Sequence, residues 1–156
     1  MAELVTVKET ADLEKILKEL PIELRVKALR SAARAGGAVV RRAAQKLAPV
    51  GDPSHNPDAK PLSKSIGMVV ESYKQDTVAV AIVGPQRPAG AHGHLIEGGH
   101  DVVVSRGERK GQQPLSGKNK VPGKEFMAPA VDGTLSKQDA AIIKSLGKSL
   151  EQASSG

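Results

Sequence analysis

The sequence predicts an α+β fold: a short N-terminal helix and a long helix packed on a small antiparallel sheet, then a long basic loop and a C-terminal helix. Three observations predict it. Apolar residues recur at helical spacing through residues 10–47. Two apolar segments separated by a polar turn follow, as in a β-hairpin. Helical spacing then returns from Leu135. A chain of 156 residues suits one core, so we expect a single domain spanning residues 1–156.

The two N-terminal helices are predicted from their apolar stripes. Residues 10–20 form a short helix, and Pro21 suits the first turn of the next one. The second helix ends at Ala48-Pro49 and, at about 1.5 Å per residue, would be roughly 40 Å long. Apolar and small residues follow it at alternating spacings of four and three, and we expect them to form its packing face: Ile22, Val26, Leu29, Ala33, Gly36, Val40, Ala43 and Leu47.

The middle and C-terminal parts contain shorter elements. Alternation at Ile66, Met68 and Val70 predicts a half-buried strand, and residues 77–83 predict a second strand that pairs with it. One or two helical turns are expected within residues 89–99, and a third strand within residues 101–105. Residues 106–123 are expected to be a flexible loop or arm. A closing helix over residues 135–150 precedes an expected frayed tail, residues 152–156.

Positive charge is concentrated in two segments. Residues 21–50 contain seven Lys or Arg and one acid, and residues 105–124 contain six Lys or Arg and one acid. On the long helix, Lys27, Arg34 and Arg41 recur every seven residues with Arg30 beside them, away from the apolar seam. Such a face suits contact with nucleic acid or with an acidic protein surface; a solvated helix face is the alternative.

The sequence gives little support to catalysis or cofactor binding, and we expect no cofactor, no metal and no enzymatic activity. Cysteine is absent, which excludes disulfides and thiolate metal sites. The histidines at 92, 94 and 100 with Glu97 match no closed metal motif, and four glycines among residues 90–99 favour a backbone role. No apolar run approaches the roughly 20 residues needed to cross a bilayer, so no membrane partner is expected.

Four landmarks occur in one order along the chain. Residues 47–49 (LAP) close the long helix, and residues 61–66 (PLSKSI) lead into the hairpin. Residues 94–100 (HLIEGGH) and residues 124–130 (KEFMAPA) follow. In these landmarks the chain resembles the tail-component or neck (tail-completion) proteins of long-tailed double-stranded-DNA bacteriophages. That family's pattern has a motif ending in Glu-Phe-Gly-Thr and a later Pro-Phe-(Leu/Met)-Arg-Pro-Ala motif. Gly98 stands where the family prefers an aromatic residue, and Ala128 where it prefers arginine.

The resemblance implies an α+β structural protein of the virion, assembled in the host cytoplasm and not an enzyme. It implies a ring, expected to be a hexamer, at the head–tail junction, which joins the head connector (or stopper) to the tail terminator or tail tube and surrounds the genomic DNA. A tail terminator ring that caps the tail tube is one alternative. A basic DNA-binding protein is another, although Tyr73 and Phe126 are the only aromatic residues available for base stacking.

Three sets of residues are candidates for these roles. The channel- or DNA-facing candidates are Lys27, Arg30, Arg34 and Arg41. The subunit-interface candidates are Glu97, Gly98, Gly99, Arg106, Arg109 and Lys110. Glu97 is expected either to accept backbone N–H bonds at a turn or to pair with an arginine of the adjacent subunit. Phe126, as a core anchor, and Pro129, leading into the last helix, are the expected structural anchors.

Overall fold

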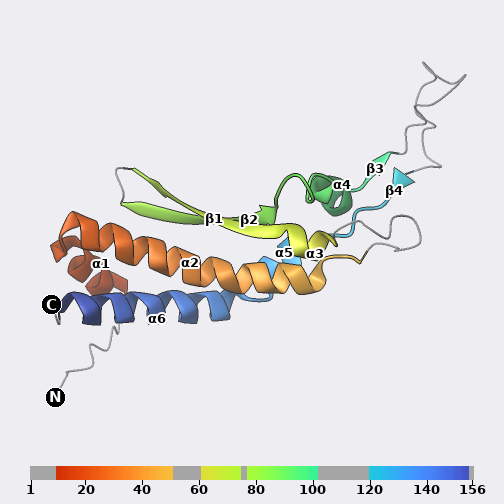
Figure 1. Ribbon diagram of the computed structural model, residues 1–156. Coiled ribbons are helices and arrows are strands. Elements are labelled where there is room, and N and C mark those ends of the chain that lie inside the picture. The colour runs from red at the N-terminus through yellow and green to blue at the C-terminus, as the bar shows by residue number, and fades with distance from the viewer. Residues whose placement is uncertain (1–9, 51–60, 75–76, 102–119, 155–156) are drawn as a thin grey trace, which may run out of the picture. The chain divides into compact units, whose positions relative to one another are not determined.

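The computed structural model describes residues 10–50, 61–74, 77–101 and 120–154 of the 156-residue chain (Figure 1). The α+β prediction is confirmed. Strand β1 pairs with β2 and β3 pairs with β4, so the described residues contain two small two-stranded sheets. The elements in chain order are α1 (Thr10–Glu19), α2 (Ile22–Leu47), α3 (Leu62–Ser65), β1 (Ile66–Tyr73), β2 (Val78–Pro85), α4 (Gly93–Gly98), β3 (His100–Asp101), β4 (Lys120–Val121), α5 (Met127–Asp132) and α6 (Leu135–Ser154).

The chain divides into two compact units. Unit 1 comprises Met1–Arg42, Met68–Val83 and Thr134–Gly156, and unit 2 comprises Ala43–Gly67 and Gly84–Gly133. The expectation of one domain over residues 1–156 stays a prediction. None of the described helices combines the length and the apolar character that crossing a membrane requires.

The face by which α2 packs differs from the predicted seam. Ile22 and Leu47, which begin and end the expected seam, are 64% and 50% exposed. The buried positions of α2 are mostly small: Ala28, Ala32, Gly36, Gly37, Val40 and Ala44. Small side chains let neighbouring elements approach the helix backbone closely. The dispersion energy of this close packing exceeds the free energy that would be gained by burying the bulky residues instead. The seam prediction was therefore right at Gly36 and Val40 and wrong at its ends.

In unit 1, α2 lies between the β1–β2 hairpin and α6 (Figure 1). A Cβ added to Gly36 would lie 2.9 Å from the side chain of Ile142 in α6. A Cβ added to Gly37, about 100° further round the helix, would lie 2.6 Å from both the Ala81 Cβ and the Met68 Sδ of the hairpin. The apolar core of this unit is formed by Ala28, Ala32 and Leu146, with Leu17 and Ile142 packed against it.

In unit 2, the segment before β1 and the segment after β2 pack together. The backbone N–H of Gln86 donates to the Ser65 carbonyl at 2.9 Å. Gly93, at the start of α4, allows the Pro85 ring to approach, since an added Cβ would lie 2.4 Å from it. Strands β3 and β4 are antiparallel, with His100 opposite Val121 and Asp101 opposite Lys120. The third strand predicted over residues 101–105 is thus described only at its start, because residues 102–119 lie outside the described part.

Candidate functional site

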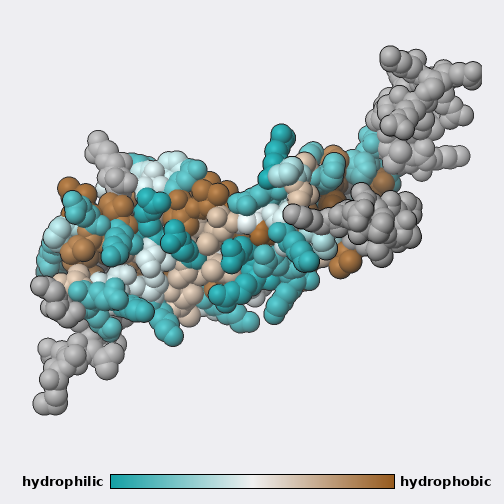
Figure 2. All heavy atoms as spheres, in the orientation of Figure 1, coloured by the Kyte–Doolittle hydropathy of each residue, from teal (hydrophilic) through white to brown (hydrophobic). Residues whose placement is uncertain are grey.

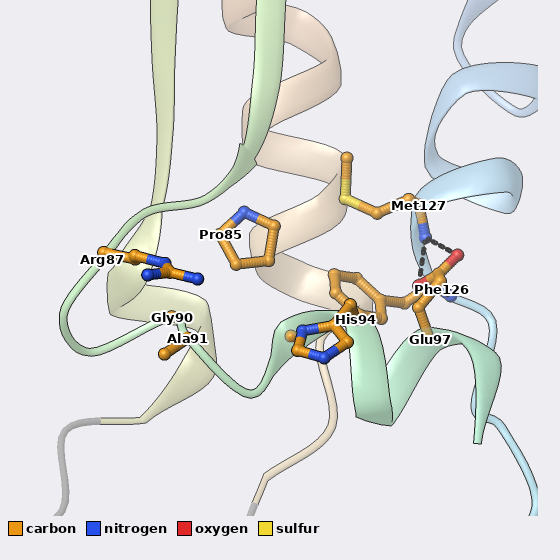
Figure 3. A pocket seen from close by; sticks show the side chains of 9 residues that line it. Pro85, Arg87, Gly90, Ala91, His94, Glu97, Phe126 and Met127 are labelled. Atoms are coloured by element: carbon orange, nitrogen blue, oxygen red, sulfur yellow. Dashed lines mark hydrogen bonds between the residues drawn. The ribbon is translucent and has the colours of Figure 1, made fainter. Parts of the chain in front are cut away.

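Residues 94–100 and 124–130, the two most distinctive stretches of the sequence, are in direct contact within unit 2. The Glu97 carboxylate accepts hydrogen bonds from the backbone N–H groups of Phe126 (3.1 Å) and Met127 (3.2 Å). Figure 3 shows those from Met127 as dashed lines. The Lys124 N–H donates to the Ile96 carbonyl at 2.8 Å. Glu97 thereby satisfies two donors at the start of α5, where a helix leaves N–H groups without intrahelical partners.

Two glycines allow these segments to approach. Gly99 has a φ of 75°, a left-handed conformation that favours glycine, and an added Cβ would lie 2.6 Å from the Val121 carbonyl oxygen. A Cβ on Gly123 would lie 2.4 Å from the Glu97 carbonyl oxygen. A Cβ on Gly98 meets nothing within 4 Å. Gly99 is therefore required for the fold of this unit, whereas Gly98 faces open space.

The two expected structural anchors lie at the start of α5. Phe126 is 2% exposed and directly precedes the helix. Pro129 is exposed and occupies the first turn of α5, where proline is tolerated because no intrahelical N–H bond is needed there. Its carbonyl accepts the Gly133 N–H at 3.0 Å. Pro129 thus belongs to α5 rather than to the chain segment directly preceding α6.

A pocket of roughly 310 Å³ opens beside these contacts (Figure 3). Its walls include the apolar side chains of Pro85, Phe126 and Met127, and Arg87 and His94 lie on the side formed by residues 85–94. Both of these side chains are exposed. The lining residues include no serine, threonine, cysteine or lysine that could act as a nucleophile. The pocket thus combines apolar walls with the exposed polar side chains of Arg87 and His94.

The basic residues of α2 share one side of the helix. At 100° per residue, Lys27, Arg30, Arg34 and Arg41 fall within an arc of about 60°. Lys27, Arg30 and Arg34 are exposed, whereas Arg41 is half-buried. Among the described residues, no hydrogen-bond partner reaches the buried Nε of Arg41. The side predicted to face DNA is therefore open over its N-terminal part.

An exposed apolar surface, which we call the outer sheet face, lies on the hairpin of unit 1. It consists of Val69, Tyr73, Val78, Val80 and Ile82, which are 38–49% exposed. Brown side chains gather over this hairpin in Figure 2. The sequence prediction gave strand 66–71 one buried face and did not identify this surface. The alternation of large Val78, Val80 and Ile82 with small Ala79 and Ala81 is the signal that could have found it.

The other predicted interface residues lie outside the described part of the chain, and the histidines at 92, 94 and 100 lie within it. The predicted role of Arg106, Arg109 and Lys110 therefore stays a prediction. Within residues 10–50, 61–74, 77–101 and 120–154, no group of three or more His, Cys, Asp or Glu side chains is placed to hold a metal ion. His92 and His94 are exposed, and the His100 ring lies 3.5 Å from the Leu95 carbonyl oxygen.

A family described as "Bacteriophage HK97-gp10, putative tail-component" matches residues 11–99. The matched region includes α2, the β1–β2 hairpin and α4 with Glu97. It ends at Gly99, the glycine in the left-handed conformation. No curated protein and no solved structure matches the chain.

Proposed function

The chain belongs to the bacteriophage HK97-gp10 tail-component family, and we propose that it forms a homo-oligomeric ring at the head–tail junction of the virion. In this role it joins the head connector or stopper to the tail terminator or tail tube. Its function is structural, and no catalytic step is proposed. The observation that carries the proposal is the family match over residues 11–99, which covers more than half of the chain.

Exposed apolar surface supports association with identical subunits. A closed ring needs two different surfaces on each subunit, because each copy contacts the next one head to tail. The outer sheet face is one such surface, and Leu135 and Ile143 of α6, 54% and 57% exposed, belong to another. Both lie in unit 1. Isolated apolar side chains are common on monomers, but clusters of this kind mark contact sites.

The exposed basic side of α2 supports a location around DNA. We assign Lys27, Arg30 and Arg34 to the wall of the ring lumen, where they attract the phosphate backbone without reading sequence. Few aromatic side chains are available for base stacking. A conduit needs such sequence-independent and reversible contact, because the genome has to move past it.

The proposal is tested by deleting the coding sequence from the phage and examining the particles by electron microscopy. The expected result is DNA-filled heads and separate tails that do not join, with joining restored when the chain is supplied in trans. In wild-type particles, cryo-electron microscopy should place the chain between connector and tail tube. Absence of the chain from mature particles would contradict the proposal, and a position on the tube end with abnormal tail lengths would indicate a tail terminator instead.

A further inference from the structure

Residues 78–82 of β2 turn their larger apolar side chains away from α2 and their alanines toward it. A sheet that packs on one side usually turns its large apolar residues toward the core. Here the half-buried side chains of β2 that face α2 include Ala79 and Ala81, whereas Val78, Val80 and Ile82 are 38–49% exposed. The same alternation places Val69 and Tyr73 of β1 outward, at 46% and 45%. Met68 and Val70 of β1 are half-buried on the side of α2, so the hairpin carries large apolar side chains on both sides and leaves those of the outer sheet face exposed.

A two-stranded hairpin covered on only one side is a weak structural unit, since isolated hairpins are marginally stable in water. In unit 1 the layers run hairpin, α2, α6 (Figure 1). Repeating this order in a neighbouring subunit would place a helix on the open side of the hairpin, so that each sheet would be covered on both sides. The layer facing the hairpin in such a stack is α6.

The exposed surface of α6 has the composition that this contact requires. Ile143 is 57% exposed and lies on one stripe with Ser136, Ala140 and Gly147, which are small. A Cβ added to Gly147 meets nothing within 4 Å. Small residues around one large apolar residue give a surface that a sheet can approach closely. Leu135, 54% exposed, extends the apolar area toward the start of the helix.

Charge also favours this pairing. The acid of the outer sheet face is Glu71, an exposed residue that accepts a hydrogen bond from the Tyr73 hydroxyl. The exposed side of α6 carries Lys144 next to Ile143, with Lys137 and Lys148 on the adjoining turns, and its exposed acids are Asp139 and Glu151. Apolar groups can then meet at the centre with opposite charges at the rim, as is usual in protein interfaces.

We propose that a second copy of this chain covers the outer sheet face with its α6, Ile143 contacting the region of Val80. The pairing deepens the proposed ring and rests on it for the closed symmetry, although the contact itself can be measured without a virion. The contact is heterologous, so each subunit uses the sheet face toward one neighbour and α6 toward the other.

Disulfide trapping tests the pairing directly, because the natural chain has no cysteine. Val80→Cys and Ile143→Cys are purified separately, mixed and oxidised, both in concentrated solution and after incorporation into particles. The expected product is the mixed Val80→Cys/Ile143→Cys dimer, in excess over either homodimer. Val131→Cys replaces Ile143→Cys in the control, since Val131 is an exposed apolar residue of unit 2, 38% exposed, and should give no excess.

Each outcome decides between the two proposals. A predominant Val80→Cys homodimer would mean that two sheets face each other, and this would overturn the inference. Absence of the mixed dimer from particles that do contain both variants would overturn it too, while leaving the ring proposal intact. Absence of the wild-type chain from particles would contradict the ring proposal, and the trapping in solution would still decide the pairing.

Tyrosine fluorescence provides a second readout. Tyr73 is the only tyrosine and the chain has no tryptophan, so the tyrosine emission reports on the outer sheet face alone. Quenching by acrylamide should fall when the chain assembles. Val80→Asp should raise the concentration for half-assembly about tenfold or more, because an unpaired carboxylate would be buried. Val131→Asp should leave it unchanged. Equal effects of the two, with unchanged circular dichroism, would count against the pairing.

Discussion

At the scale of single residues, Glu97 connects two parts of unit 2 that are far apart in sequence. Its carboxylate binds backbone N–H groups 29 and 30 residues further along the chain. Hydrogen bonds to an ionised acceptor are stronger than neutral ones, and the N-terminus of a helix favours negative charge. Both oxygens are thus used inside the subunit; a contact between Glu97 and a neighbouring subunit stays a prediction.

Replacing this carboxylate should destabilise unit 2. Glu97→Gln keeps one oxygen acceptor but places an amide N–H donor opposite a backbone N–H donor. We therefore expect the free energy of unfolding to fall by about 1–3 kcal/mol. Thermal unfolding followed by circular dichroism measures it. Glu125→Gln, an exposed acid on the adjoining segment, should change the stability by less than about 0.5 kcal/mol. Equal effects of the two substitutions would show that the contact contributes nothing.

The glycine pair at the end of α4 provides an internal comparison. Gly99→Ala would place an alanine in a left-handed conformation, with its Cβ 2.6 Å from backbone atoms. We therefore expect the free energy of unfolding to fall by about 2 kcal/mol or more. Gly98→Ala lies in the last position of α4 with open space around it and should be neutral or slightly stabilising. Chemical denaturation of both variants provides the measurement. A neutral Gly99→Ala would contradict the close approach of Gly99 to residues 121–123.

Tyr73 offers a pH-dependent signal. Its hydrogen bond to Glu71, desolvation and the repulsion between phenolate and carboxylate raise the pKa of Tyr73 above its ordinary value of 10.0. Absorbance at the phenolate band should therefore titrate above pH 10, and Glu71→Gln should lower the midpoint, because it removes the negative charge. An unchanged midpoint in the variant would show that Glu71 does not control this titration.

At the scale of elements, α2 is organised by its small residues rather than by its large ones. Gly36 and Gly37 point to different neighbours, Ile142 of α6 and Met68 of β1. The Ser31 and Ser145 hydroxyls, 3.0 Å apart, add a polar contact between α2 and α6. A bulky residue at these positions would separate the layers of unit 1. The helix therefore depends on two glycines that, by intrinsic propensity, weaken it.

Two glycine-to-alanine substitutions should change the free energy of unfolding in opposite directions. Gly37→Ala places a Cβ 2.6 Å from Ala81 and Met68, so overpacking should cost about 1–3 kcal/mol. Gly147→Ala, in α6 with nothing near the added methyl group, should stabilise by about 0.5–1 kcal/mol through helix propensity. Urea unfolding monitored by circular dichroism measures both. Stabilisation by Gly37→Ala would contradict the packing of the hairpin on α2.

At the scale of the whole molecule, the described residues leave open a basic helix side, the outer sheet face, the exposed side of α6 and a pocket. Lys27, Arg30 and Arg34 are exposed on the basic side. Their number limits what one subunit can do alone. Three phosphate contacts give weak, sequence-independent binding, and a ring would multiply them around one DNA duplex.

DNA binding by the isolated subunit should therefore depend only weakly on salt concentration. Filter binding of duplex DNA should give a plot of the logarithm of the binding constant against the logarithm of the salt concentration with a slope no steeper than about −3, corresponding to three phosphates. Arg30→Ala with Arg34→Ala should reduce the slope by about 2, whereas Lys137→Ala on α6 should not change it. A much steeper slope for the wild-type monomer would favour the alternative of a basic DNA-binding protein.

Much of the architecture was predictable because it is encoded locally. The α2 boundaries at Ile22 and Leu47 were predicted correctly from Pro21, Pro49 and the helical spacing between them. The hairpin was also predicted correctly, although β2 continues through Gly84 and Pro85, beyond the end predicted at residue 83. Residues 94–100 stood out in the sequence by their glycines, but the contact of Glu97 with Phe126 and Met127 could not be identified from residue spacing alone.

The sequence by itself determined which segments are helices and strands, where α2 ends and which family the chain resembles, because periodicity, proline and short motifs act over a few neighbouring residues. Only the tertiary structure decided which side of α2 is buried, that the larger residues of β2 point outward, and that Glu97 holds the start of α5. These features depend on the distance of closest approach between segments remote in sequence, and packing density sets that distance.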